Sequence, residues 1–167
     1  YGIENIYGPQ FRRVTLPAAF DMRRGLLGKG ALLAVTSQAV RTSPVMRGKW
    51  VQATLLGVEP PAPPPGVEVN IERSTDNTGN AKQMTMRQVL EKHRISPTCS
   101  ACHQIFEPVG LALENFDAVG AWRTHEEGIP VDPSGKLPDG TNLDRGVAAL
   151  RENLVKYQDQ FARVVAE

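Results

Sequence analysis

Apolar residues recur at helical spacing along much of the chain. Ser43 is a preferred N-cap residue and Pro44 suits the first helical position, so we predict a helix over residues 43–56 that stops at Gly57. The apolar stretch 25–37 has about the length of a buried helix, although its three glycines weaken that prediction. These segments predict helical packing in the first third of the chain.

Helical signals continue in the second half. Thr85 is expected to cap a helix that runs to His93 and ends before Pro97. A short helix should open at Thr98 or Ser100 and close at Pro108 and Gly110, followed by one or two helical turns at 111–116. The apolar spacing over 146–165 fits one helix or a broken pair with its core face inward.

The remaining segments are irregular. Glycine and proline punctuate residues 1–22 and 126–142, and the polar stretch 72–82 is expected to be a mobile surface loop. The proline run at 60–65 predicts a polyproline II linker or strap. We therefore expect a mostly α protein with long irregular loops and a proline-rich segment.

Two regions are expected from this pattern. Residues 1–82 would form an N-terminal flank that contains helix 43–56 and the proline-rich strap 60–65. Residues 83–167 would form the domain that carries the chemistry and ends in the C-terminal helix. The 167-residue length suits a single compact unit made of both.

Composition excludes several classes of partner. The formal charge is +1 with no run of lysine and arginine, so nothing favours nucleic acid or an anionic membrane. No apolar stretch reaches the roughly 18–20 residues needed to span a bilayer. The first residues have neither a basic start nor an apolar core, so we expect that any signal peptide was removed or lies upstream, and that the chain is part of a larger polypeptide.

The strongest chemical signal is the stretch Cys99-Ser100-Ala101-Cys102-His103, which holds both cysteines of the chain. This is the C-x-x-C-H pattern of covalent c-type haem attachment. Two thiols at this spacing suit addition to the two vinyl groups of one haem, and the adjacent His103 suits the proximal iron position. We predict one covalent haem c.

Other interpretations of the two cysteines are less consistent with the sequence. A zinc site lacks further cysteines and an H-x₃₋₅-H pair, and a thioredoxin-like dithiol would need a βαβ setting and no histidine. A disulfide would close a ring too small to stabilise much.

A longer set of motifs surrounds the pentad. Its segments are His93-Arg94-x-x-Pro97, Glu107-Pro108-x-Gly110-x-Ala112-Leu113-Glu114-Asn115-Phe116-Asp117, Gly120-x-Trp122-Arg123, and the upstream stretch 41–50. They resemble the cytochrome c-like domain of large planctomycete-type secreted proteins, and residues 130–145 with the closing helix resemble the small domain that follows it. The resemblance spans roughly residues 20–165 and implies haem attachment, export and a multi-domain context, but no known reaction. Glu107 stands where the family often has aspartate, which keeps the charge.

The sequence alone does not decide which residue, if any, is the second axial ligand of the iron. No methionine follows Met86, so a distal ligand must come from upstream, be a histidine, or be absent. His93 is the leading candidate, because it lies ten residues before His103 and a segment of that length can reach across a haem. The alternatives are Met86, Met84, Met46 and His125.

Two further residues follow the pentad closely. Arg123 is expected to pair with a haem propionate and Trp122 to lie at the haem edge, with Arg47 and Lys49 as second choices. The alternative is a surface arginine beside a packed tryptophan. The acidic positions after residue 130 do not match the calcium-loop spacing.

Three functions are consistent with these residues. The favoured one is a periplasmic or extracellular module that exchanges single electrons with a redox partner protein or domain, rather than an enzyme. The second is a five-coordinate haem that binds a small ligand or peroxide, with a histidine and arginine near the iron. The third is a structural haem module in a large secreted protein.

Overall fold

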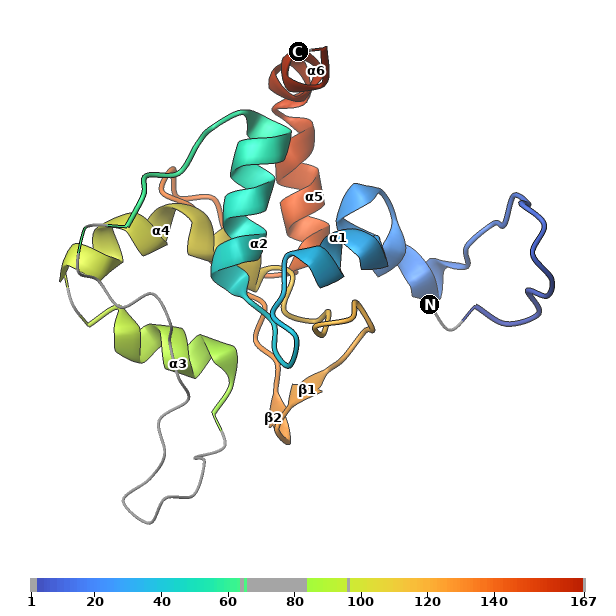
Figure 1. The fold of residues 1–167 in the computed structure, drawn as a ribbon, viewed down its shortest axis with the longest axis horizontal. Helices are drawn as coiled ribbons and strands as arrows, with labels where there is room; N and C mark the ends of the chain where they lie inside the picture. The colour runs from blue at the N-terminus through green and yellow to red at the C-terminus, as the bar shows by residue number, and fades with distance from the viewer. Residues whose placement is uncertain (1–2, 64, 66–83, 96, 167) are drawn as a thin grey trace.

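The computed structural model describes residues 3–63, 65, 84–95 and 97–166. About 48% of the chain is helical and one small two-stranded sheet is present (Figure 1), which confirms the mostly α prediction. The loop predicted at 72–82 lies outside the described residues, as does the boundary predicted between residues 82 and 83.

The N-terminal part is an exposed arm followed by short helices. Residues 3–17 extend away from the body (Figure 1) and lead into the 3-10 helices η1 (Ala18–Arg23) and η2 (Leu26–Gly28) and the helix α1 (Gly30–Val35). The stretch 25–37 is thus not one helix. Lys29 has extended backbone torsions, which separate the two helical pieces.

The predicted helix 43–56 is confirmed. It consists of α2 (Pro44–Trp50), which continues directly into the π-helical turn η3 (Val51–Leu55). The Ser43 hydroxyl accepts a hydrogen bond from the Met46 amide at 3.3 Å, as its N-cap position requires. The prolines that follow, in the described stretch 61–63, are exposed.

Helix α3 (Met86–His93) begins at the predicted cap. The Thr85 hydroxyl accepts from the Gln88 amide while the Gln88 side chain accepts from the Thr85 amide, which completes a capping box. Met86, Val89 and Leu90 form its buried face.

Helix α4 (Pro97–Leu111) is longer than predicted, because it starts at Pro97 and continues through Pro108. The helix does not end at Pro108, but it ends at Leu111, one residue after Gly110, the other predicted end. A proline inside a helix removes the hydrogen bond to the carbonyl four residues earlier, which here belongs to Gln104. The Gln52 side chain of η3 donates to the neighbouring carbonyl oxygen of Ile105 at 2.7 Å. Tertiary contacts with α2 and η3 therefore support the helix across this position.

Helices α2 and α4 cross at backbone contact. A Cβ atom on Gly48 would lie 1.9 Å from the Phe106 carbonyl oxygen, and one on Gly110 would lie 1.7 Å from the Pro44 carbonyl oxygen. Only glycine fits at both positions. The Pro-x-Gly motif thus serves helix packing.

The C-terminal part contains a hairpin and two helices. Strands β1 (His125–Glu126) and β2 (Ile129–Pro130) pair antiparallel across Glu127 and Gly128, which both have positive φ. This hairpin was not predicted and lies at the start of the loop expected for 126–142. Helices α5 (Val147–Val155) and α6 (Gln158–Ala166) are the broken pair predicted for 146–165.

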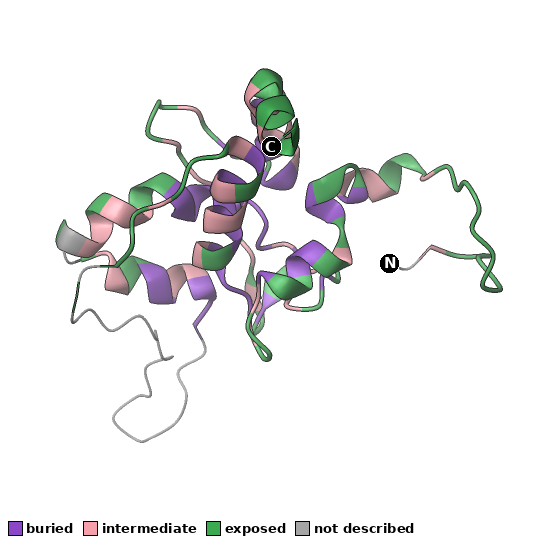
Figure 2. Ribbon diagram, turned by 45° about the horizontal axis from the view of Figure 1, so that its top comes forward, coloured by how far each residue is buried: buried purple, intermediate pink, exposed green. Residues whose placement is uncertain are grey.

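A single cluster of buried apolar side chains joins both halves of the chain. Figure 2 shows buried residues gathered in the middle of the molecule, where α1, α2, the end of α4 and α5 come together, while the N-terminal arm is exposed. The cluster consists of Leu27, Leu32, Leu33, Val51, Leu55, Val109, Ala112, Leu113, Phe116, Leu143, Val147 and Leu150. Within α4, Val109 at the C-terminal end belongs to this core. His103, nearer the N-terminal end, contacts His93 of α3 instead.

Candidate functional site

The cysteines and the following histidine occupy the first two turns of α4. Cys99 and Cys102 are both free thiols and both half-buried. Residues three apart on a helix lie on the same face. The two sulfurs are therefore presented on one side of α4, with neither consumed by a disulfide.

His103 is oriented by a buried carboxylate. Glu107 lies one turn further along α4, is fully buried, and places Oε2 at 2.9 Å from Nδ1 of His103. An ionised carboxylate only accepts hydrogen bonds, so we assign the ring proton to Nδ1. This tautomer leaves Nε2 of His103 as the unprotonated nitrogen, which is the form that binds a metal.

Arg94 completes this arrangement from the end of α3. Its Nε lies 3.2 Å from the second oxygen of Glu107, a close charge contact whose alignment is not that of a hydrogen bond. The carboxylate of Glu107 thus bridges the histidine of α4 and the arginine that follows α3.

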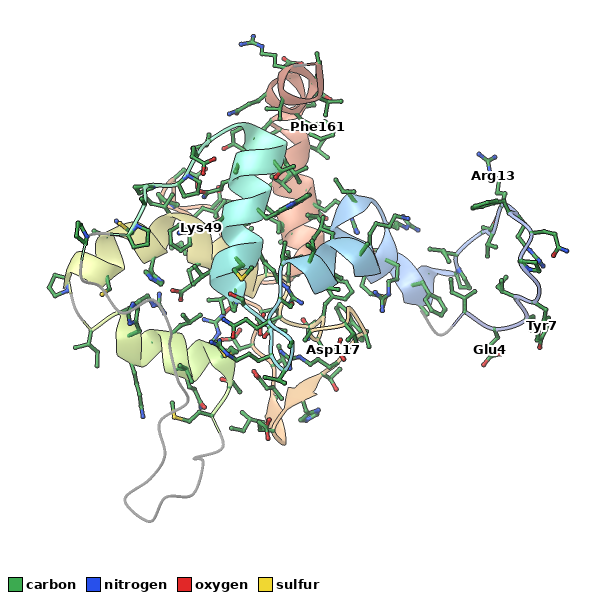
Figure 3. The ribbon with its side chains drawn as sticks, viewed as in Figure 1. Glu4, Tyr7, Arg13, Lys49, Asp117 and Phe161 are labelled. Carbon is green, nitrogen blue, oxygen red and sulfur yellow. The ribbon has the colours of Figure 1, made fainter. Side chains whose placement is uncertain are left out.

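His93 lies directly beside His103. Their ring centroids are 5.0 Å apart, and the planes are inclined at 59°. Phe106 contacts the same ring of His103 at 5.2 Å, and Lys49, on the side of α2 that faces α4 (Figure 3), lies over Phe106. The structure therefore brings together the predicted proximal histidine and the leading candidate for the distal one.

Burial favours the neutral form of His93. Desolvation lowers the pKa of His93, the nearby His103 lowers it further, and Glu107 partly opposes both effects. A neutral imidazole is the species that coordinates iron, so the surroundings of His93 suit a ligand.

The other candidate distal ligands have different surroundings. Met84 and Met86 are buried, with their sulfurs near the Lys92 ammonium at 3.5 Å and the Arg41 guanidinium at 3.6 Å. Met46 is exposed. His125 is exposed on β1, where its Nδ1 lies 3.0 Å from the Thr124 hydroxyl.

Arg123 and Trp122 lie against the segment that follows α4. The Arg123 guanidinium contacts the carboxylate of Glu114 at 3.0 Å and that of Glu126 at 3.8 Å. Trp122 packs edge-on against Phe116 at 5.1 Å. These contacts give both residues a structural role, and a propionate contact for Arg123 stays a prediction.

Several residues of the motifs around the pentad form one cluster of mostly buried charged and polar side chains. We call Thr42, Arg47, Glu114 and Arg123 the buried charge cluster. Arg47 is fully buried and donates to the carbonyl oxygens of Leu113, Phe116 and Asp117 at 2.7–2.9 Å. Arg47 also pairs with Glu114 at 3.4 Å. The motif around Glu114 thus shapes the turn after α4.

Burial changes the acid–base behaviour of this cluster. Desolvation raises the pKa of Glu114 to about 7, although Arg47, the Thr42 hydroxyl at 2.8 Å and Arg123 each lower it. Desolvation also lowers the pKa of the Arg47 guanidinium. The sequence analysis missed these roles, as it missed that of Glu107. An acidic residue four positions after His103 was the available signal for the latter.

Comparison with known proteins identifies a family. The PSCyt3 family, described as a protein of unknown function (DUF1588), matches residues 23–126. The chain belongs to this family. PSCyt3 domains are found in planctomycete-type cytochrome-containing proteins, which agrees with the resemblance seen in the sequence. The matched region contains the pentad, His93, Glu107 and the buried charge cluster.

No curated protein and no solved structure matches the PSCyt3 chain. Among the described residues, no helix is long and apolar enough to cross a membrane. In the same part of the chain, no three His, Cys, Asp or Glu side chains gather to hold a metal ion by themselves.

Proposed function

We propose that this PSCyt3 domain carries one covalent haem c and passes single electrons to and from a redox partner. Cys99 and Cys102 would hold the haem through thioether bonds, and His103 would bind its iron through Nε2. A bound haem would supply a one-electron couple between ferric and ferrous iron. Since such haems are attached outside the bacterial cytoplasm, the proposal includes export to the periplasm or cell exterior.

The observation that carries the proposal is that Glu107 orients His103 with Nε2 available to bind a metal. A buried carboxylate at 2.9 Å from Nδ1 fixes both the tautomer and the direction of the ring. Both thiols are free on the adjacent turn. The donor set therefore fits the group that the C-x-x-C-H pattern implies.

The neighbourhood of His93 favours an electron carrier over an enzyme. Two imidazoles that share one iron, with metal–nitrogen bonds of about 2 Å, have ring centroids roughly 6 Å apart. The observed separation of 5.0 Å is about 1 Å shorter, so the two rings would move apart to share an iron. A small ligand or peroxide would instead require open space beside the proximal histidine.

The test begins with covalent attachment. The domain would be coexpressed with a c-type haem maturation system, and attachment would be read by haem staining of a denaturing gel. We expect the wild type to stain and the double variant C99A/C102A not to. An unstained wild-type band, in cells whose control cytochrome does stain, would overturn the proposal.

The axial ligands decide between the electron carrier and its alternatives. Resonance Raman and magnetic circular dichroism spectra should show two histidines in the wild type. H93A should lose the second histidine and bind carbon monoxide rapidly when reduced, whereas the matched variant H125A should resemble the wild type. Rapid stoichiometric carbon monoxide binding by the wild type would favour the five-coordinate alternative. Very slow electron exchange with small redox partners would favour a structural role for the haem.

A further inference from the structure

We propose that Glu107 is a positioning residue that sets the reduction potential of this site through His103 and braces His93 through Arg94. The inference rests on the proposed function, because it concerns the electronic effect of a carboxylate on an iron ligand. Glu107 would not touch the haem itself.

The first observation is the burial of the negative charge. The Glu107 side chain is fully buried, so solvent does not screen it. Its Oε2 accepts the Nδ1 proton of His103 at 2.9 Å, which increases the electron donation of the opposite nitrogen. A more basic imidazole and a nearby negative charge both stabilise ferric over ferrous iron. Glu107 therefore lowers the reduction potential.

The second observation is the contact with Arg94. The Arg94 side chain is 30% exposed and its Nε lies 3.2 Å from Oε1 of Glu107. The positive charge of Arg94 offsets part of the cost of burying the negative charge of Glu107. Arg94 and His103 thus face opposite oxygens of the same carboxylate.

The third observation is the position of this ion pair in the fold. Glu107 belongs to α4, which carries His103, and Arg94 directly follows His93 at the end of α3. One carboxylate therefore connects the two elements whose histidine rings lie 5.0 Å apart. This ion pair links the two elements that carry the candidate iron ligands.

The decisive variant is E107Q, which keeps the size of the side chain and removes its charge. The matched control is E91Q on α3, because Glu91 is half-exposed and its pair with Arg87 at 3.9 Å is open to solvent. We expect E107Q to favour the ferrous state at least tenfold, a rise of about 59 mV for a one-electron couple. E91Q should move the potential far less. A shift in E107Q no larger than that in E91Q would overturn the inference.

A conservative variant separates electrostatics from packing. R94K keeps the positive charge near Glu107, so we expect its potential to lie closer to the wild type than that of E107Q. If R94K raises the potential as much as E107Q, the effect comes from disturbed packing and the inference is wrong.

A second measurement does not depend on any variant folding. In the wild-type chain produced without haem attachment, ¹⁵N NMR in mildly alkaline buffer should show His103 protonated at Nδ1. Protonation at Nε2 would refute the role of Glu107 even if the chain carries haem in its mature form. Failure of the wild type to acquire haem would instead refute the proposed function. The two failures are therefore distinguishable.

Discussion

Replacing Arg47 with methionine should destabilise the domain more than any exposed arginine substitution. Methionine keeps most of the length of the side chain but donates no hydrogen bonds. Arg47 is fully buried between α2 and the turn after α4, where its guanidinium donates to three backbone carbonyl oxygens and pairs with Glu114. R47M removes all of these contacts at once.

The structure allows the magnitude to be worked out. The carbonyl oxygens of Leu113 and Asp117 would keep the amides of Phe116 and Gly120 as donors, whereas that of Phe116 would lose the Arg47 donor at a cost of about 1–3 kcal/mol. Removal of one partner from a buried ion pair costs about 3–5 kcal/mol, although Arg123 would still compensate part of the charge of Glu114. Because these contributions overlap, we expect a total loss of about 3–5 kcal/mol. Domains of this kind have a free energy of unfolding of about 5–15 kcal/mol, so R47M should unfold at a much lower denaturant concentration.

Urea unfolding followed by tryptophan fluorescence measures this loss, since Trp50 and Trp122 both lie in the folded body. The control is R145M, because Arg145 is 65% exposed and pairs only at the surface with Glu152. An exposed pair contributes about 0–1 kcal/mol. The reasoning would be refuted if R47M and R145M lost similar amounts, or if R47M lost less than about 1 kcal/mol with an unchanged denaturant slope.

Three further predictions follow from the same packing. G110A should lower the free energy of unfolding by about 1–3 kcal/mol, because its methyl group would overlap the Pro44 carbonyl oxygen. The loss should appear as a lower thermal midpoint, and an unchanged midpoint would contradict the backbone contact between α2 and α4. L33A should lose about 2–5 kcal/mol in urea unfolding, since Leu33 is fully buried in the core, and a loss below 1 kcal/mol would contradict that position. Burial raises the pKa of Glu114 from 4.5 to about 7, so the contribution of this residue to the free energy of unfolding is full below about pH 4.5 and is lost as pH rises through 7, a decline of up to about 3 kcal/mol. E114Q should lack this decline, and parallel pH profiles for E114Q and the wild type would show that Glu114 titrates elsewhere.

Local signals in the sequence determined the helix starts and the candidate chemistry. Ser43 and Thr85 cap helices in the structure because an N-cap bonds to amides only two or three residues away, within its own segment. The C-x-x-C-H pattern is equally local, since it places two thiols and a histidine on consecutive turns of α4. The motifs around the pentad also resembled a domain of planctomycete-type cytochrome-containing proteins, in which PSCyt3 domains are found.

Tertiary structure alone decided which charged residues are buried and what they contact. Arg47 and Glu114 lie 67 positions apart, and no pattern in either segment shows that they meet. Helix α4 continues through Pro108 because α2 packs against it at Gly48, which outweighs the local tendency of proline to end a helix. The contact between the rings of His93 and His103 likewise depends on how α3 packs beside α4. The sequence shows which residues suit a haem iron, and the packing of α2, α3 and α4 decides their contacts, hydrogen bonds and separation.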